Sequence, residues 1–440
     1  MKAVANTTSP RQAAGLPPGP STSPVKQTFH YWRERQHYLP QMFDRFGDIV
    51  TLRLIPHSPF VILRDPEHIR EVFRGAPEIF HGGKGNWNLL PIVGRNSLLT
   101  LDAPEHKPER KRMMPPFHHE RIAALVDTMR QIAENEARRW PVGRPFRFLD
   151  RSYALTLEII VKAVLGVDDP RRAAALSDAL HKVADMDLSG ILVLIRPELG
   201  KFWPWRKFVR DLDHANRLIY EEIAMRRRDP KRDQRTDVLS MLLEDPDADD
   251  RDVRDEVMTL LMAGHETTAV GLAWLFERLL RHPAAHARLR RGLDEPKDPY
   301  RTAVFKEALR VRPVIHNVAR RLTEPIELAG YRLPAGATVV PAIGAVQQDE
   351  RFWGHDAAEF RPERWIDGNP PAQAWLPFGG GVRRCIGAMF AQVEIETVVA
   401  AILRTVAIEA VDPADEGDRM HHITMIPKEG TRIRVVRRLG

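Results

Sequence analysis

The chain has 440 residues, 43% of them hydrophobic, and its 66 Lys and Arg exceed its 59 Asp and Glu by a net charge of +7. This length can bury a core and enclose a cofactor, while the modest charge, without zinc-finger spacing or an RNA-binding aromatic signature, argues against nucleic-acid binding. The single cysteine, Cys385, excludes an intramolecular disulfide and a multi-thiolate metal site, and it is typical of the reducing cytoplasm.

The N-terminal residues 1–25 are rich in Pro, Ser and Thr, and they predict a flexible or extended arm. They lack the apolar core of a signal peptide or a membrane anchor, so we expect a soluble, cytoplasmic protein. We interpret residues 26–440 as one catalytic domain. Within it, the apolar runs 49–54 and 60–63 flank a Pro-containing turn and predict a hairpin.

Helical patterns dominate from about residue 120 to residue 310, with apolar periodicity at 123–132, 155–165 and 212–228. The best-defined helix follows the acidic segment 245–255, where an aspartate can cap it, and it ends near His282-Pro283. Its roughly 33 residues would span about 50 Å, the width of a large domain. The charged residues inside it, such as Glu266 and Glu277, disfavour a membrane span.

Short strand patterns follow residue 310. They occur at 326–328, 331–333 and 338–341, and a last hairpin is predicted from 423–426 and 432–436 around Gly430. The sequence therefore predicts a mainly α protein with a minor antiparallel β region, an α+β fold class.

A glycine-rich loop at 377–387 surrounds the only cysteine. Its glycines permit tight turns and close approach to a flat ligand, and Arg383 and Arg384 favour a thiolate at Cys385. A helix follows, so its dipole adds to that preference. Such a thiolate suits an axial iron ligand, because its electron donation helps to break the O–O bond of dioxygen. The alternatives are a structural cysteine, a phosphate loop, whose lysine is absent, and a nucleophile, which needs a base.

The loop matches a ten-residue pattern, Phe-x-x-Gly-x-Arg-x-Cys-x-Gly, at Phe378, Gly381, Arg383, Cys385 and Gly387. In this it resembles the signature of the cytochrome P450 family. The resemblance implies a triangular prism with a long central helix over haem b (iron protoporphyrin IX). It makes Cys385 the iron ligand and places the other four residues in the cofactor site.

Two further segments resemble the family's structural network. Glu307 and Arg310 lie three residues apart and share a helix face, which alone would be an ordinary surface ion pair. Arg364 follows in a Pro-Glu-Arg segment, and the resemblance implies a buried triad of the three side chains. Trp365 departs from the family, which often has Phe there.

Residues 263–268 resemble the family's oxygen-binding segment. By resemblance, Gly264 would leave room for dioxygen, Thr267 would hydrogen-bond the bound oxygen or a water, and Glu266 would feed protons inward. The alternative is an ordinary helix interior in which the threonine hydroxyls bond back to the backbone.

Four side chains are expected to bind the haem propionates by the same resemblance. His106 and Arg110 lie four residues apart on one face of a helix that should begin near Lys107, since Pro108 is tolerated only in a first turn. Arg320 and Arg383 would complete the set.

The resulting prediction is a monomeric monooxygenase that hydroxylates or epoxidises an apolar substrate: a fatty acid, terpenoid, steroid or polyketide. No flavin or nicotinamide domain is visible, so electrons would come from ferredoxin and ferredoxin reductase. The alternatives are a peroxide-driven peroxygenase and a non-catalytic haem sensor, which the Glu266-Thr267 pair disfavours. A lone-cysteine hydrolase would have no visible chromophore.

Two surfaces complete the predictions. An acidic ferredoxin would dock on basic residues near the cysteine loop, of which Lys111, Arg112 and Arg384 are the best candidates. The substrate pocket would draw on segments 82–99, 181–205, 258–267, 314–318 and 420–425. Four polar side chains in those segments would face the substrate, water or each other: His316, Asn317, His421 and His422.

Overall fold

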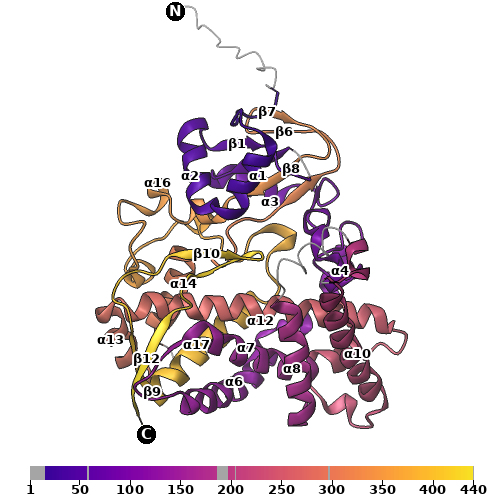
Figure 1. Cartoon of the computed structure of the whole chain (residues 1–440), viewed down its shortest axis with the longest axis vertical. Helices are drawn as coiled ribbons and strands as arrows, with labels where there is room; N and C mark the ends of the chain where they lie inside the picture. Colours follow the sequence, from indigo (N-terminus) through magenta and orange to yellow (C-terminus); the bar gives the residue numbers. More distant parts are fainter. Residues whose placement is uncertain (1–14, 57–58, 186–196, 204, 296–297, 440) are drawn as a thin grey trace, which may run out of the picture.

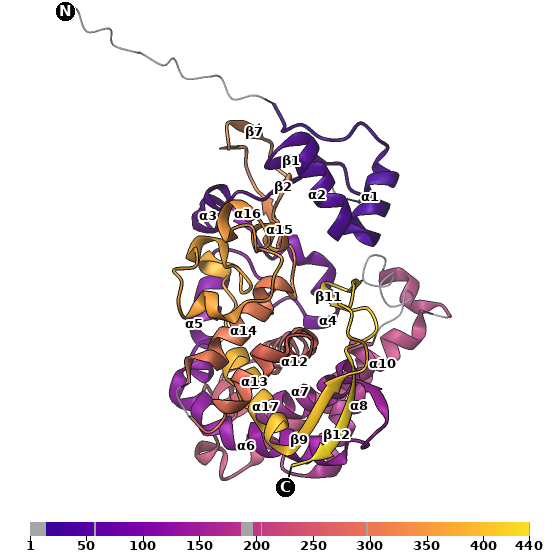
Figure 2. The same ribbon diagram turned by 90° about the vertical axis from the view of Figure 1, so that its left-hand side faces the viewer.

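We describe the protein from a computed structural model, which places residues 15–439 except 57–58, 186–196, 204 and 296–297. Helices make up most of the described chain, and short strands form small sheets (Figures 1 and 2). The mainly α class with a minor β region is confirmed. Most strand pairs are antiparallel, whereas β2 (Phe60–Leu63) and β8 (Thr338–Pro341) run parallel.

The longer helices are α6 (His119–Arg139), α7 (Phe148–Leu165), α8 (Pro170–Ala184), α10 (Arg206–Arg228), α12 (Asp250–Leu280), α14 (Pro299–Val311) and α17 (Ala388–Thr405). The shorter ones are α1 (Pro24–Arg33), α2 (Arg35–Phe46), α3 (Pro66–Arg74), α4 (Leu90–Val93), α5 (His106–Met113), α11 (Val238–Leu242), α13 (Pro283–Arg291), α15 (Ile343–Val346) and α16 (Glu350–Trp353). The predicted start of α5 near Lys107 is confirmed.

Helix α12 crosses the whole molecule, with α6, α7, α8, α10 and α17 on one side and the sheet-rich part on the other (Figure 1). The side chain of Asp249 caps it by accepting the Arg251 backbone N–H at 2.7 Å, and Asp250 and Asp252 lie in the first turn. Both features satisfy free N–H groups and suit the helix dipole. The prediction of one long central helix is therefore confirmed, and most residues of α12 are buried.

The remaining strands are β1 (Ile49–Leu52), β3 (Phe80–His81), β4 (Pro145–Arg147), β5 (Arg320–Leu322), β6 (Ile326–Leu328), β7 (Tyr331–Leu333), β9 (Val406–Ala410), β10 (Asp418–His421), β11 (Thr424–Pro427) and β12 (Arg432–Arg438). The largest sheet has the order β1-β2-β8-β5-β3. The predicted hairpin of β1 and β2 is confirmed, with Ile49 opposite Leu63 and Leu52 opposite Phe60.

The predicted last hairpin is wrong. Strand β11 pairs with β10, whereas β12 pairs with β9 and β4. The second edge of β11 is already used, because Met425 donates its N–H to the Val314 carbonyl and its own carbonyl accepts the Trp274 indole N–H. The turn at Gly430, with φ of +74°, therefore leads the chain to a different sheet.

The predicted N-terminal arm lies outside the described residues from 1 to 14. From Pro17 to Pro20 the chain packs along β1, where the Pro18 carbonyl accepts the Thr51 N–H at 2.9 Å. Pro17 and Pro20 are buried. Gly19 allows this approach, because a Cβ there would collide with the Thr51 carbonyl. This part of the segment is thus packed against the fold.

Candidate functional site

The glycines of the cysteine loop face α3. Gly379 and Gly381 both have φ of +65°, and a Cβ on Gly380 or Gly381 would collide with Phe73. The sequence predicted that these glycines approach a flat ligand, which stays a prediction. In the structure, Gly380 and Gly381 allow the loop to pack against the end of α3.

Cys385 lies three residues before α17, and its backbone N–H donates to the Phe378 carbonyl at 3.0 Å. Burial raises the pKa of the Cys385 thiol, against the lowering effects of the Gly387 N–H, Arg110 and Arg384. The residue nevertheless keeps accessible surface. A raised pKa and an accessible surface are compatible when the sulfur borders a space within the fold. A metal ion bound there would deprotonate the thiol.

Four basic side chains gather beside this loop with one carboxylate among them. Arg383 donates to Asp102 Oδ1 at 2.7 Å. Burial and then repulsion by Arg383 and Arg110 lower the pKa of His106 to about 4, and burial and Arg383 lower the pKa of Arg320 to about 10. The pKa values of Arg110 and Arg383 are also lowered, first by burial. A cluster with this excess of positive charge fits a ligand with two carboxylates, as the propionates of haem are.

The middle of α12 is more open than the turns on either side. Ala263 is exposed, and Met262, Gly264, Glu266 and Thr267 beside it are partly buried. The Thr267 hydroxyl donates to the Ala263 carbonyl at 2.6 Å, so it follows the backbone-bonded alternative. Gly264 also lies against α7, because a Cβ there would be 2.9 Å from Ile160. Its missing side chain therefore serves helix packing, and its predicted role of leaving room for dioxygen stays a prediction.

Glu266 is held by the turn between β10 and β11. Its Oε1 accepts from Thr424 Oγ1 at 2.8 Å and from His421 Nδ1 at 3.1 Å, and His422 Nδ1 lies 3.8 Å away. Burial raises the pKa of Glu266, but these partners have the larger effect and lower the pKa to about 2. Sequence reasoning missed this contact, because nothing local shows that the turn folds back onto α12.

The predicted triad is brought together in the core. Arg310 pairs with Glu307 through bonds of 2.8 and 2.9 Å, and Arg364 Nε lies 3.2 Å from Glu307 Oε1. Trp365, the departure from the family pattern, donates its indole N–H to Glu307 Oε2 at 2.9 Å. The tryptophan therefore joins the network as a further donor.

The polar residues predicted for the pocket have protein neighbours. Asn317 Nδ2 donates to the Tyr31 hydroxyl at 3.2 Å. Burial, then Arg35 and Arg312, lower the pKa of His316 to about 3. Of the apolar lining expected from segment 82–99, Ile92 and Val93 are buried in the core. Residues 188 and 191–194, expected from the second segment, lie outside the described residues.

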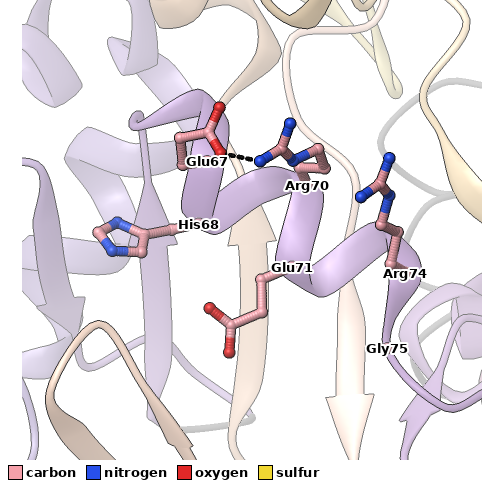
Figure 3. A pocket seen from close by; sticks show the side chains of 6 residues that line it. All are labelled: Glu67, His68, Arg70, Glu71, Arg74 and Gly75. Carbon is pink, nitrogen blue, oxygen red and sulfur yellow. Dashed lines mark hydrogen bonds and ion pairs between the residues drawn. The ribbon is translucent and has the colours of Figure 1, made fainter.

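A surface hollow lies on the exposed face of α3 (Figure 3). Its lining consists of Glu67, His68, Arg70, Glu71, Arg74 and Gly75. Glu67 and Arg70 form an ion pair. Five of these residues belong to α3, and Gly75 follows it directly. Because the other face of α3 carries Phe73 against the cysteine loop, this hollow is not part of the candidate site.

The comparisons with known proteins agree with this geometry. The family model for cytochrome P450 matches residues 15–433. The putative cytochrome P450 135B1 of Mycobacterium tuberculosis is 40% identical over 432 residues, covering 96% of this chain and 91% of the relative. The putative cytochrome P450 135A1 of the same organism is 37% identical over 435 residues, 97% of each chain.

Solved structures show the same fold. Cyanobacterial CYP120A1 with bound retinoic acid has a TM-score of 0.84 at 22% identity, covering 97% of this chain and 100% of that one. The haem domain of cytochrome P450DA has a TM-score of 0.82 at 24% identity, covering 97% and 98%. Across the residues that the structure places, none of the helices has the length and apolar character for crossing a membrane.

Proposed function

Because the chain belongs to the cytochrome P450 family, we propose that it inserts one oxygen atom of dioxygen into an apolar organic molecule. The family makes it a haem-thiolate monooxygenase, an oxidoreductase whose cofactor is haem b. The proposal adds the substrate class, the reaction as hydroxylation or epoxidation, and a separate ferredoxin and ferredoxin reductase as the electron source.

One observation supports the cofactor site above the others: an accessible Cys385 lies beside four basic groups, of which Arg383 bonds to the Asp102 carboxylate. Cys385 would ligate the haem iron as a thiolate, and His106, Arg110, Arg320 and Arg383 would bind the propionates. When bound, haem activates dioxygen with two electrons and two protons, so that one oxygen atom enters the substrate and the other leaves as water.

Two side chains of α12, Thr267 and Glu266, would deliver protons for the reaction. The Thr267 hydroxyl must leave the Ala263 carbonyl, to which it donates at 2.6 Å, before it can donate elsewhere. The carboxylate of Glu266, with its low pKa, accepts hydrogen bonds from Thr424 and His421. A carboxylate with this pKa is ionised and only weakly basic, so it would hold a proton only transiently when it relays one from its neighbours.

An apolar substrate is supported by partly buried hydrophobic side chains of the expected segments. They are Leu89, Met262, Ile315 and Val318. Such side chains favour apolar ligands of the fatty acid, terpenoid, steroid or polyketide kind. A screen for ligands that shift the haem spin state would identify the compound class.

The reaction is tested by isotope labelling. With reduced ferredoxin, ferredoxin reductase and ¹⁸O₂, the product of a spin-shifting ligand should gain one ¹⁸O atom, and H₂¹⁸O should contribute none. Product formed with peroxide but not with reduced ferredoxin would indicate a peroxygenase. A coloured protein that yields no product by either route, across all ligands of the screen, would indicate a sensor.

The Cys385→Ala variant tests the iron ligand. The reduced carbon monoxide adduct of the wild type should show the strongly red-shifted Soret band of thiolate-ligated haem. The variant should lose that band, because the chain has no second cysteine to replace the thiolate. An unchanged band in the variant would contradict the assignment of Cys385.

A further inference from the structure

Three metal-binding side chains converge where the turn between β10 and β11 meets α12. They are Glu266 of the helix, His421 at the end of β10 and His422 of the turn, and one ligand atom of each lies within 4.8 Å of the others. We propose that this cluster binds a divalent transition-metal ion of the zinc type. The site is separate from the proposed haem ligand, Cys385.

The distances fit such an ion. His421 Nδ1 and His422 Nδ1 lie 3.1 and 3.8 Å from Glu266 Oε1. Ligand atoms about 2.1 Å from a tetrahedral zinc ion are about 3.4 Å apart, which falls between the two observed values. Metal binding would displace the Nδ1 protons, leaving the neutral tautomers protonated at Nε2. Small side-chain movements are therefore enough to complete the coordination.

The backbone of His422 gives an independent indication. Its φ is +52°, in the left-handed region, and it is the first of two residues that connect β10 to β11. Glycine is favoured at this position of such a turn, because a side chain there is strained. A strained histidine that points toward another histidine and a carboxylate is typical of a functional side chain.

The scaffold holds the ligands from both sides. On β11, Met425 donates its N–H to the Val314 carbonyl at 2.9 Å and accepts the Trp274 indole N–H at 2.7 Å. The Thr424 hydroxyl donates to Glu266 Oε1 at 2.8 Å and orients the carboxylate. Partners of this kind fix the ligand geometry around a metal ion.

The donor set and its exposure determine which ion fits. Two imidazoles and one carboxylate suit zinc, nickel or copper better than magnesium or calcium, which prefer oxygen ligands. The side chains of His421, Glu266 and His422 are 24%, 13% and 11% exposed, so water can supply the remaining ligands.

The position of the site suggests its effect. A bound ion would fix the β10–β11 turn on α12 and occupy Glu266, next to Thr267 in the chain. If the proposed function holds, zinc would therefore slow turnover by removing Glu266 from proton transfer. The binding itself does not depend on that function.

The experiment uses the full-length, haem-loaded protein and zinc chloride. Calorimetric titration should give one site per chain, and X-ray absorption at the zinc edge should show two imidazole nitrogens and an oxygen near 2.1 Å. This edge does not overlap that of the haem iron, so the reading is independent of activity.

Two variants remove single ligands. His421→Ala and His422→Gly should each weaken zinc binding by about tenfold or more. The second also relieves the strained backbone, so it should fold at least as well as the wild type. His30→Ala is the control, because His30 Nδ1 lies 2.9 Å from Glu34 and, among the described residues, no third metal-binding side chain joins this pair.

The outcomes separate the two claims. Zinc that binds with equal affinity to the wild type and both variants, or wild-type protein that binds none at about 100 μM zinc, would overturn the site and leave a hydrogen-bonded cluster only. Zinc binding that requires both histidines, in a protein without monooxygenase activity, would support the site and count against the proposed function instead.

Discussion

At the scale of single residues, Trp365 shows how a departure from a family pattern can be functional. Its indole N–H donates to a carboxylate that also accepts from Arg310 and Arg364, and the three charged side chains are buried. Buried charges require such donors, because an unsatisfied carboxylate oxygen in the core is costly. Phenylalanine, common in the family at this position, has no donor to offer.

We expect Trp365→Phe to lower the free energy of unfolding by about 2 kcal/mol, because a hydrogen bond to a buried charge is lost. Trp375→Phe is the control: Trp375 packs 5.5 Å from Trp365, but its indole donates to the neutral Lys306 carbonyl at 3.3 Å. In urea unfolding, the decrease in the free energy of unfolding for Trp375→Phe should be smaller than that for Trp365→Phe by about 1 kcal/mol. Equal losses would mean that packing alone explains the residue.

The hydroxyl of Thr267 allows a second residue-scale prediction. In Thr267→Ala, electron consumption should continue while product falls several-fold and peroxide rises, because proton delivery is disturbed. Thr267→Ser, which keeps the hydroxyl, should restore coupling. Product per electron that is the same in all three proteins would remove Thr267 from the mechanism.

At the scale of elements, Gly264 lies where α12 packs on α7. Glycine inside a helix costs about 1 kcal/mol relative to alanine, and the structure explains why it is present. A Cβ there would lie 2.9 Å from Ile160 Cδ1 and 3.2 Å from Cγ1. The missing side chain of Gly264 thus allows the two helices to pack closely, at a cost in helix propensity.

A double-mutant cycle tests this account. Gly264→Ala alone should give no gain in stability, because the new methyl collides with Ile160. In the Ile160→Val background, which lacks Cδ1, the same change should stabilise by about 1 kcal/mol. Thermal unfolding of the four proteins measures the coupling. Independent effects would argue against packing on Ile160 as the reason for the glycine.

At the scale of the whole molecule, α12 separates the helical side from the sheet-rich side, and the site combines segments from distant parts of the sequence (Figure 2). The structure removes one residue from the basic surface that we predict to dock ferredoxin. Arg112 is held by Glu109 through bonds of 2.5 to 3.1 Å, whereas Lys111 and Arg384 are exposed. The latter two are therefore the better docking candidates.

We expect Lys111→Gln and Arg384→Gln each to slow electron transfer from an acidic ferredoxin by about two- to fivefold at low salt. The difference from the wild type should shrink as salt increases, since exposed charges are screened. Lys207→Gln, on α10 and paired with Asp211, should have no effect. Stopped-flow rates that do not depend on salt would argue against this docking face.

The sequence by itself determined the elements and the chemistry. Caps, periodicity and turn residues act over a few positions, so α12, α5 and the first hairpin were predictable, and the loop around Cys385 identified the family. Tertiary structure decided what lies opposite each side chain. Gly264 meets Ile160, the cysteine-loop glycines meet Phe73, and β11 pairs with β10, because each depends on partners far along the chain.

The same reason explains the cluster at Glu266. The sequence showed an acid in a helix and two histidines about 155 residues later, but no local rule places a turn against a distant helix. Only the packing of β11 on α12 brings the three side chains together. Side-chain chemistry is therefore readable from the sequence, whereas long-range neighbours, and the pKa values that depend on them, come from the fold.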